Sequence, residues 1–531
     1  MNIDSRYRIF FVWGMAVLLA AISFILDGSR GFNPADEGFV WHAAWRTLHG
    51  DVPLRDFLSY DAGRHYWQAA WMWLLGDGLF AMRLGDTAFQ MIGLGFGLFA
   101  LTRITRNCFV LFSIGLLLTL GMTPSFKLFE PALAMMIILV GVRLIEEPTH
   151  KRYLVAGVCA GLAGFIGKNL GIYAVVAMGL MTMVLAAKER RIDISKFAMF
   201  GVGILLGFMP AIVMMLIVPG FAEALWDSSV RILEIGAGNN LGLPIPWPWT
   251  LSLANIVSPA SAAEMARGIT YVCMVLFILV VPFLIWMKRD YKIGEFALLL
   301  SSWAVAVSFS HHAFGRAGPS HLAQGFHPFL IGMLAIGPTV TRDSARRIYY
   351  GFSGMIMFIA IMGVIIIRPF VRQHLSSPDK WTTISLGNTP VTMPATIERD
   401  IASFRQVQEY CIGKGKPFFV APNWPAAYPI LGVKAPTWDT YFMFPETAKR
   451  QEIVLSGLVA GDVRWILLSD VALDGRDERR FRNTYPLVYG WIENNYREIQ
   501  VPQLPRGFRL LYRADLYPAG LPQECTDWTA Q

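Results

Sequence analysis

Apolar segments close to the length of a membrane span recur along most of the chain, and they constrain its fold more than any other feature. A helix needs roughly 20 predominantly apolar residues to cross the hydrocarbon core of a bilayer. The 531-residue chain is 54% hydrophobic and 16% charged, whereas a soluble domain carries roughly 25% charged residues. The sequence therefore predicts an α-helical polytopic membrane protein.

We expect about eleven transmembrane helices. They are predicted near residues 9–26, 79–101, 109–122, 128–144, 153–166, 171–187, 197–218, 269–286, 296–310, 322–337 and 349–367. Glycines four residues apart, such as Gly157 and Gly161, predict that some of these helices pack closely.

The basic residues indicate how these helices are oriented. Every second loop is short and rich in Lys and Arg, which is typical of cytoplasmic loops. This pattern, rather than a nucleic-acid groove, accounts for the net charge of +8. We expect a bacterial cytoplasmic membrane protein with a cytoplasmic N-terminus. Residues 27–78, the Lys168 turn, residues 311–321 and everything after residue 368 are then predicted on the outer face.

The composition changes near residue 371 to that of a water-soluble domain. Helical spacing is found at residues 397–410, and short apolar runs at 417–420 and 464–468 predict buried strands. We therefore expect a transmembrane module over residues 1–370 and an extracytoplasmic α/β domain over 371–531. Cys411 and Cys525 would both lie on the oxidising side, where a disulfide between them can persist.

The first outer loop is unusually polar for a segment between two membrane spans. Asn33 followed by Pro34 predicts a helix start, with Asn33 as the N-cap. Trp41 and Trp45 fall on one face of this helix, which predicts that it lies in the membrane interface. On spacing alone, Asp36 is either a carboxylate that stabilises the helix start or a functional acid.

Three motifs in this loop resemble those of a known superfamily. They are the acidic pair Asp36-Glu37, the stretch Gly50-Asp51-Val52-Pro53-Leu54-Arg55-Asp56-Phe57, and the stretch Asp61-Ala62-Gly63-Arg64-His65-Tyr66. The loop resembles that of bacterial polyprenyl-phosphate-sugar-dependent glycosyltransferases of the GT-C superfamily, such as protein O-mannosyltransferases and aminoarabinose transferases. Leu54, Asp61-Ala62 and His65 depart from the family pattern and leave the sugar open.

The resemblance implies an inverting sugar transfer from a polyprenyl-phosphate donor. Asp36 would be the general base, because a sugar hydroxyl is a poor nucleophile until a carboxylate takes its proton. Glu37 would orient a substrate hydroxyl or the neighbours of Asp36. The acceptor, which can be a lipid, a glycan or a protein, stays open.

A departing lipid phosphate needs preorganised positive charge. Lys168 and Asn169 resemble the family's K-Q-x-x-G turn, and Arg316 and His321 match a family R-x-D-x-x-H-L pattern in which Gly318 stands for Asp. Lys168 can alternatively be an interfacial anchor, and Arg64 can bind phosphate or pair with Asp36. We expect phosphate binding by Arg64, Lys168, Arg316 and His321, and other substrate contacts by Arg55, Asp56, His65, Asn169, His311 and His312.

Other function classes are less consistent with the sequence. A secondary transporter would show two similar halves with interrupted helices at mid-depth, and no such symmetry is seen. A non-catalytic envelope assembly protein needs neither the acidic pair nor the cations. No recognised metal-ligand spacing occurs among the histidines of the outer loop, so we expect no obligatory metal or other cofactor. The expected partners are the lipid-linked donor, the acceptor and membrane lipid, without nucleic acid.

Overall fold

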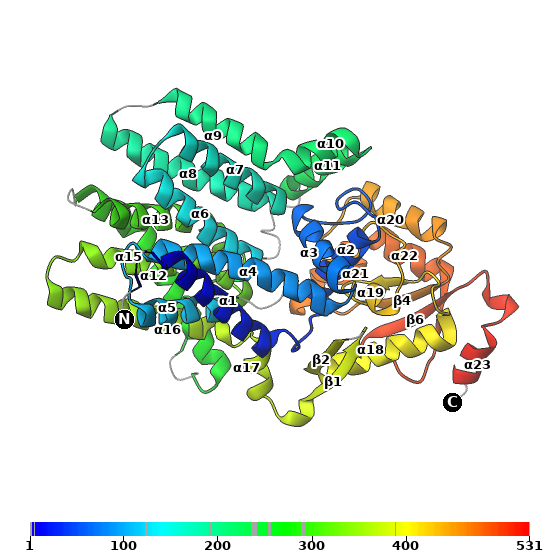
Figure 1. The fold of residues 1–531 in the computed structure, drawn as a ribbon. Coiled ribbons are helices and arrows are strands. Elements are labelled where there is room, and N and C mark those ends of the chain that lie inside the picture. Colours follow the sequence, from blue (N-terminus) through cyan, green and yellow to red (C-terminus); the bar gives the residue numbers. More distant parts are fainter. Residues whose placement is uncertain are drawn as a thin grey trace. The chain divides into compact units, whose positions relative to one another are not determined.

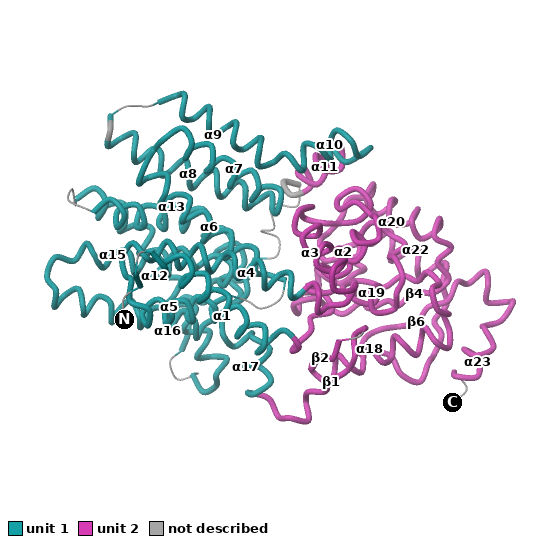
Figure 2. The backbone as a smooth tube through the Cα atoms, viewed as in Figure 1, with its two compact units in different colours: residues 1–28, 83–222, 236–375 teal, residues 29–82, 223–235, 376–531 magenta. Residues whose placement is uncertain are grey.

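A computed structural model describes residues 3–4, 6–122, 126–190, 193–234, 242–252, 256–287, 292–387 and 389–529. The chain is mainly helical (Figure 1) and divides into two compact units (Figure 2). Unit 1 comprises residues 1–28, 83–222 and 236–375, and unit 2 comprises residues 29–82, 223–235 and 376–531. The predicted outer loop thus belongs to the same unit as the C-terminal segment, and the domain boundary near residue 371 stays a prediction.

Unit 1 is built from helices that match the predicted spans. They are α1 (Arg8–Asp27), α4 (Leu79–Leu101), α5 (Cys108–Gly121), α6 (Phe129–Glu146), α7 (His150–Ile166), α8 (Lys168–Glu189), α9 (Ile194–Gly207), α10 (Met209–Ile217), α12 (Pro259–Met287), α13 (Ile293–Gly315), α14 (Pro319–Gly325), α15 (His327–Ile336), α16 (Asp343–Ile365) and α17 (Pro369–His374).

The polytopic membrane class is confirmed, but fewer helices than expected are long and apolar enough to span a bilayer. Within the described residues, six helices meet both conditions, or seven if the bent α9–α10 pair is one span. Helices α5 and α7 have only 14 and 17 residues. Helix α6 has 18 residues but carries Glu130, Arg143 and Glu146.

Two predicted spans are interrupted in the structure. The span expected at 197–218 is broken into α9 and α10, which are bent by 54° relative to each other. The span expected at 322–337 is broken into α14 and α15. Pro210 and Pro328 each lie in the first turn of the second helix, where the missing proline N–H is tolerated but cannot continue the preceding helix.

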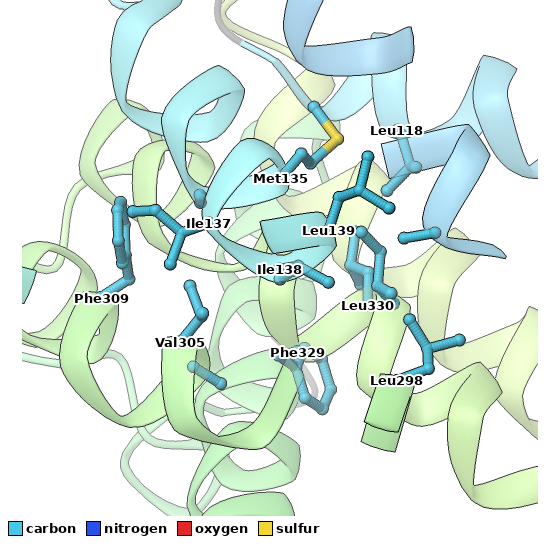
Figure 3. Close-up of a cluster of buried hydrophobic side chains, with 14 of the residues drawn as sticks. Leu118, Met135, Ile137, Ile138, Leu139, Leu298, Val305, Phe309, Phe329 and Leu330 are labelled. Carbon is cyan, nitrogen blue, oxygen red and sulfur yellow. The ribbon is translucent and has the colours of Figure 1, made fainter. Parts of the chain in front are cut away.

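Helices α6 and α13 lie in the core of unit 1 (Figure 3). Ile137 and Ile138 of α6 and Leu298 and Val305 of α13 are completely buried. The predicted close packing at glycines is confirmed for α7 and α9, which lie side by side in Figure 1. A Cβ on Gly157 would lie 2.1 Å from the backbone oxygen of Phe200.

Three arginines from separate segments gather around one aromatic ring in unit 1. The guanidinium carbons of Arg8, Arg103 and Arg143 lie 5.1, 5.3 and 5.6 Å from the centre of the Phe99 ring. Arg103 also makes two hydrogen bonds to Glu146, at 2.9 and 3.0 Å. The start of α1 therefore lies at the same end of the unit as the ends of α4 and α6, as alternating spans require.

Unit 2 combines helices with two small sheets. Its main helices are α2 (Asp36–Leu48), α3 (Gly63–Leu75), α11 (Phe221–Glu234), α18 (Ala395–Val407), α19 (Ala427–Leu431), α20 (Ala448–Ala460), α21 (Phe481–Thr484), α22 (Pro486–Asn495) and α23 (Gln523–Thr529). Its strands are β1 (Trp381–Leu386), β2 (Thr389–Pro394), β3 (Phe419–Ala421), β4 (Trp465–Ser469), β5 (Tyr496–Ile499) and β6 (Phe508–Arg513).

The larger sheet has the order β3-β4-β6-β5, in which only the β3–β4 pair is parallel. The helix predicted at 397–410 and the strands predicted at 417–420 and 464–468 correspond to α18, β3 and β4. Strands β1, β2, β5 and β6 are not predicted from the sequence.

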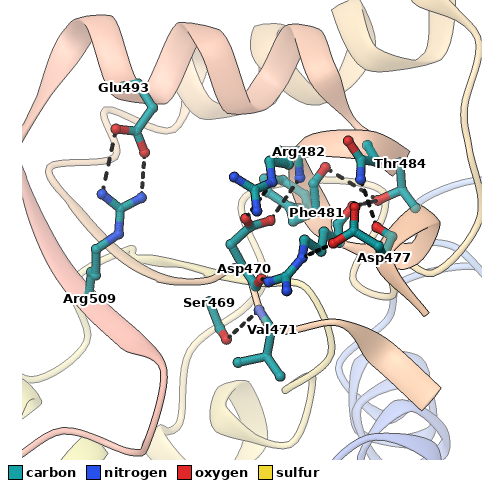
Figure 4. Close-up of polar contacts among 11 residues, drawn as sticks. Ser469, Asp470, Val471, Asp477, Phe481, Arg482, Thr484, Glu493 and Arg509 are labelled. Carbon is teal, nitrogen blue, oxygen red and sulfur yellow. Dashed lines mark hydrogen bonds and ion pairs between the residues drawn. The ribbon is translucent and has the colours of Figure 1, made fainter. Parts of the chain in front are cut away.

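The loop after β4 is held by Asp470, whose carboxylate accepts the Arg482 N–H at 3.1 Å and pairs with its guanidinium at 3.0 Å (Figure 4). Cys411 and Cys525, for which the sequence leaves a disulfide open, are bonded to each other.

Candidate active site

The first turn of α2 is capped by the residue that the sequence predicts. Asn33 Oδ1 accepts the backbone N–H groups of Ala35 and Asp36, both at 3.0 Å. These are the donors that a helix start leaves without intrahelical partners, and an Asn side chain two or three residues earlier satisfies them. Helix capping therefore does not require the Asp36 carboxylate.

The Asp36 carboxylate instead interacts with a residue from the C-terminal part of the chain. Its Oδ1 accepts a hydrogen bond from the Tyr441 hydroxyl, and its Oδ2 accepts one from Asn33 Nδ2 at 3.4 Å. The Tyr441 ring lies 5.5 Å from that of Phe39, which in turn lies 5.5 Å from that of Tyr60. A half-buried acid is thus surrounded by aromatic side chains and oriented by a hydroxyl.

Glu37 differs from its neighbour in both burial and partner. Only 2% of Glu37 is exposed, and its Oε2 accepts the backbone N–H of Asn33 at 3.4 Å. This contact resembles the reciprocal half of a capping box, in which an acid in the first turn reaches back to the cap residue. One interaction of Glu37 is thus with the start of its own helix.

The apolar face of α2 does not face outward as the sequence predicts for a helix in a membrane interface. Trp41 and Trp45 are only 3% and 9% exposed, and Trp41 Nε1 donates to the carbonyl oxygen of Asp77 at 3.3 Å. The start of the helix packs against Ala426, whose N–H donates to the carbonyl oxygen of Pro34 at 3.2 Å. The apolar stripe that the sequence predicts to face lipid is therefore buried within unit 2.

Arg55 and Asp56 bind each other in the loop after α2. The guanidinium donates to both carboxylate oxygens, at 2.8 and 2.9 Å. Asp56 Oδ2 also accepts the Val52 N–H at 2.7 Å. The hydrogen bonds from Arg55 and from the Val52 backbone lower the pKa of Asp56, against the raising effect of burial. Both residues hold the loop, and their predicted contacts with substrate stay a prediction.

Arg64 and His65 begin α3. Arg64 forms an ion pair with Asp61, with 3.6 Å between Nη2 and Oδ2. His65 is 1% exposed, and burial together with the adjacent Arg64 charge lowers its pKa to about 3. His65 is therefore a neutral core side chain at physiological pH. The phosphate-binding role of Arg64 and the substrate-binding role of His65 stay predictions.

Lys168 is the first residue of α8 and is half-buried, while Asn169 beside it is exposed. A cation at a helix N-terminus is unfavourable with the helix dipole, whereas an anion there is stabilised by the free N–H groups. The position of Lys168 is thus one at which a bound anion would interact with both the ammonium and the helix start.

The remaining predicted residues lie around the end of α13 in unit 1. The Tyr173 hydroxyl of α8 hydrogen-bonds to His311 Nδ1 at 2.6 Å, and the Tyr173 ring lies 5.2 Å from that of His312. Arg316 follows α13 directly, and His321 lies in α14.

The structure brings four of the basic side chains of unit 1 together. Lys127, Arg316 and His312 are all near enough to His321 to act on it electrostatically. Lys127 was not predicted as a site residue. Lys127 lies in a short loop between two apolar segments. The alternation of basic loops assigns this loop to the outer face, which could have indicated Lys127 as a candidate.

Within the described part of the chain, no three His, Cys, Asp or Glu side chains gather closely enough to hold a metal ion. Independence from metal stays a prediction.

No protein-family model and no curated protein matches the sequence. Among solved structures, ArnT from Cupriavidus metallidurans in the apo state has a TM-score of 0.44 and 11% identity, over 96% of this chain and 98% of that chain. The same protein bound to undecaprenyl phosphate has a TM-score of 0.43 and 12% identity over the same shares. The oligosaccharyltransferase from Archaeoglobus fulgidus in the apo form has a TM-score of 0.43 and 10% identity, over 88% and 70%.

Both of these proteins are GT-C glycosyltransferases, the superfamily that the outer-loop motifs resemble.

Proposed function

We propose that the chain is a glycosyltransferase that moves a sugar from a polyprenyl-phosphate donor to an acceptor hydroxyl with inversion at the anomeric carbon. The observation that carries the proposal is the Asp36 carboxylate, which lies in a motif resembling that of the superfamily and is oriented by a tyrosine hydroxyl rather than used as a helix cap. A carboxylate in such a position suits general-base catalysis.

In the proposed reaction, the acceptor oxygen attacks the anomeric carbon from the face opposite the lipid phosphate. The new carbon–oxygen bond forms as the bond to the phosphate oxygen breaks, and the hydroxyl proton passes to Asp36. One displacement inverts the configuration and requires a single base. The lipid phosphate leaves as an anion, without the sugar.

Leaving-group stabilisation is proposed for the cations of unit 1. Lys168 lies at a helix start suited to anions. Lys127 and Arg316 supply positive charge near His321, whose neutral ring can donate one hydrogen bond to a phosphate oxygen. Such charge lowers the energy of a developing phosphate anion when it is already in place before the reaction. The proposal leaves the sugar open, together with the choice of lipid, glycan or protein as acceptor.

The proposed location is the bacterial cytoplasmic membrane, with the N-terminus inside and the C-terminal domain outside. A periplasm-active reporter fused after residue 531 should be active, and activity of a cytoplasm-specific reporter at that position would overturn the orientation.

The function is tested with purified Asp36→Asn protein and a radiolabelled polyprenyl-phosphate sugar. We expect turnover to fall by roughly 10²–10⁴-fold, because the amide cannot take the proton. Asn has nearly the same shape, so the melting temperature should change little. Near-normal turnover by well-folded variant protein would refute the assignment of the base. Uptake of the donor without release of lipid phosphate would refute the transferase activity and indicate a transporter.

A further inference from the structure

The C-terminal part of the chain contributes directly to the surroundings of the proposed base. Tyr441 is 405 residues away from Asp36 in the sequence, yet its hydroxyl donates to Asp36 Oδ1 within unit 2. We propose that Tyr441 is a positioning residue that holds the Asp36 carboxylate in its catalytic orientation. This inference rests on the proposed function, because it gives Tyr441 a role through the base.

The backbone that carries Tyr441 is fixed by the core of unit 2. The neighbouring Phe442 is completely buried, and its ring lies 5.3 Å from that of Phe419 and 4.9 Å from that of Tyr485. The Phe442 N–H donates to Pro422 O at 3.0 Å, and its carbonyl oxygen accepts the Thr484 hydroxyl at 3.1 Å. The position of Tyr441 is therefore set by the packed domain.

The residues before Tyr441 are fixed as well. Asp439 Oδ2 accepts the Tyr485 hydroxyl at 3.1 Å, and its carbonyl oxygen accepts the Thr437 hydroxyl at 2.6 Å. Arg231 of α11 lies 3.9 Å from Asp439 Oδ1 and forms an ion pair with Glu446. The segment 437–442 is thus held on both sides of Tyr441 by buried contacts.

The same segment also holds the outer loop. Trp438 Nε1 donates to Leu54 O at 3.0 Å, and the Leu58 N–H donates to Trp438 O at 2.8 Å. Through Trp438 and Tyr441, one stretch of the C-terminal domain fixes both the loop after α2 and the carboxylate at its start.

The Tyr441 hydroxyl has a chemical consequence beyond packing. Its hydrogen bond occupies one carboxylate oxygen and restricts rotation of the side chain, so the geometry of the second oxygen is set before substrate binds. Tyr441 is only 9% exposed, so water replaces this hydroxyl poorly.

The test compares Tyr441→Phe with Tyr496→Phe. Tyr496 is a matched control, because it lies in the same unit and its hydroxyl donates a buried hydrogen bond, at 2.6 Å, to Val463 O. The kcat and KM of each variant are measured on a polyprenyl-phosphate sugar, and its melting temperature is recorded. Both variants should fold, because each removes one oxygen atom and keeps the ring.

We expect Tyr441→Phe to lower kcat by roughly 10-fold with little change in KM, because the variant loses the hydrogen bond that orients the carboxylate. Tyr496→Phe should leave both unchanged. Equal behaviour of the two variants, or a loss in Tyr441→Phe that appears in KM rather than in kcat, would overturn the positioning role.

Asp36→Asn separates this inference from the proposed function. If that variant is inactive while Tyr441→Phe behaves as wild type, the positioning role fails alone. If Asp36→Asn is fully active, the proposed base fails, and the positioning role fails with it. Adding Tyr441→Phe to Asp36→Asn should cause no further loss, whereas an additive loss would show that Tyr441 acts independently of the carboxylate and would overturn the inference.

Discussion

Arg368 and Asp27 form a buried ion pair although 341 residues separate them in the sequence, with 2.8 Å between Nε and Oδ2. Both residues are 2% exposed, and the pair joins the end of α1 to the segment before α17. Arg368 also donates to the backbone oxygens of Thr119 and Met122, and Ser23 Oγ accepts from its Nη2. One guanidinium thus connects three helix ends of unit 1.

Replacing Arg368 by Met should destabilise unit 1 by about 3–5 kcal/mol, because the substitution leaves Asp27 as an uncompensated buried charge. Thermal unfolding in detergent measures the change. Arg347→Met is the control, because Arg347 is exposed. The double variant Asp27→Leu, Arg368→Met should recover part of the loss. A single variant as stable as the Arg347 control would contradict the prediction.

The disulfide between Cys411 and Cys525 should stabilise the end of unit 2. It closes a stretch of 114 residues, and loops of this size are stabilised by roughly 4–5 kcal/mol in the chain-entropy model. Changing both cysteines to Ser should therefore lower the free energy of unfolding by up to that amount.

Alkylation of the denatured protein followed by mass spectrometry checks the bond directly. Of the five cysteines in the sequence, Cys108, Cys159 and Cys273 are free thiols in the structure. These three alone should react before reduction, and all five after it. Labelling of Cys411 without reductant would contradict the prediction.

The helices of unit 1 were predictable because their signal is local. An apolar run identifies its own helix, and α4 has the bounds that the sequence predicts. Whether the chain bends within a run depends on packing. Pro210 and Pro328 are compatible with a kink or with the start of a new helix, so the breaks before α10 and α15 could not be decided from residue type.

The surroundings of the candidate base were less predictable, because they come from remote segments. The capping of α2 by Asn33 follows from adjacent residues, and it was predicted. The contact between Asp36 and Tyr441 depends on how the domain folds. For the same reason, the burial of Trp41 could not be distinguished in sequence from exposure to lipid, since both environments favour an apolar stripe.

Unit 2 should lose stability between about pH 4 and pH 6 through Asp439. Burial raises the pKa of Asp439 to about 6, although Arg231 opposes the shift. The folded state then binds the proton more tightly than the unfolded state, so stability falls as the pH rises through this window. The Asp439→Asn variant lacks this titration. Its stability relative to wild type should therefore increase by on the order of 2–3 kcal/mol as the pH rises from about 4 to about 7.

Asp462→Asn is a control with the opposite sign. Hydrogen bonds from Arg513 and Arg464 lower the pKa of Asp462, so its contribution to stability is present above its unfolded pKa and is lost as the pH falls. Melting of both variants in detergent at acidic and neutral pH gives the comparison. The same pH response in both would contradict the assignment to Asp439.

The cations of unit 1 should act on the lipid phosphate rather than on the acceptor. Lys168→Ala, Arg316→Ala and His321→Ala should each lower kcat/KM for the donor by roughly 10-fold or more, because the first two remove positive charge and the third removes a hydrogen-bond donor near the proposed leaving group. Free polyprenyl phosphate should also become a weaker product inhibitor of these variants. Lys151→Ala, at an exposed position on α7, is the control. An increase in the KM of the acceptor alone would contradict the role.

Gly38 should be essential for the placement of Asp36, because it allows α2 to approach Ala426. A Cβ at Gly38 would lie 2.6 Å from the Ala426 Cβ and 2.8 Å from its backbone nitrogen. The backbone of Ala426 cannot give way easily, since its N–H donates to Pro34 O at 3.2 Å. Gly38→Ala should therefore push the first turn of α2 away from the domain that carries Tyr441.

We expect Gly38→Ala to destabilise the protein by about 1–3 kcal/mol, as overpacking of a close contact does, and to lower turnover because Asp36 moves with the turn. Gly490→Ala is the matched control, since Gly490 lies in α22 of the same unit and a Cβ there meets nothing within 4 Å. Ala426→Gly in the Gly38→Ala background should restore only part of the activity, because the contact with the Ala426 backbone remains. If Gly38→Ala has the same melting temperature and turnover as Gly490→Ala, the approach of α2 to Ala426 does not determine the position of the base.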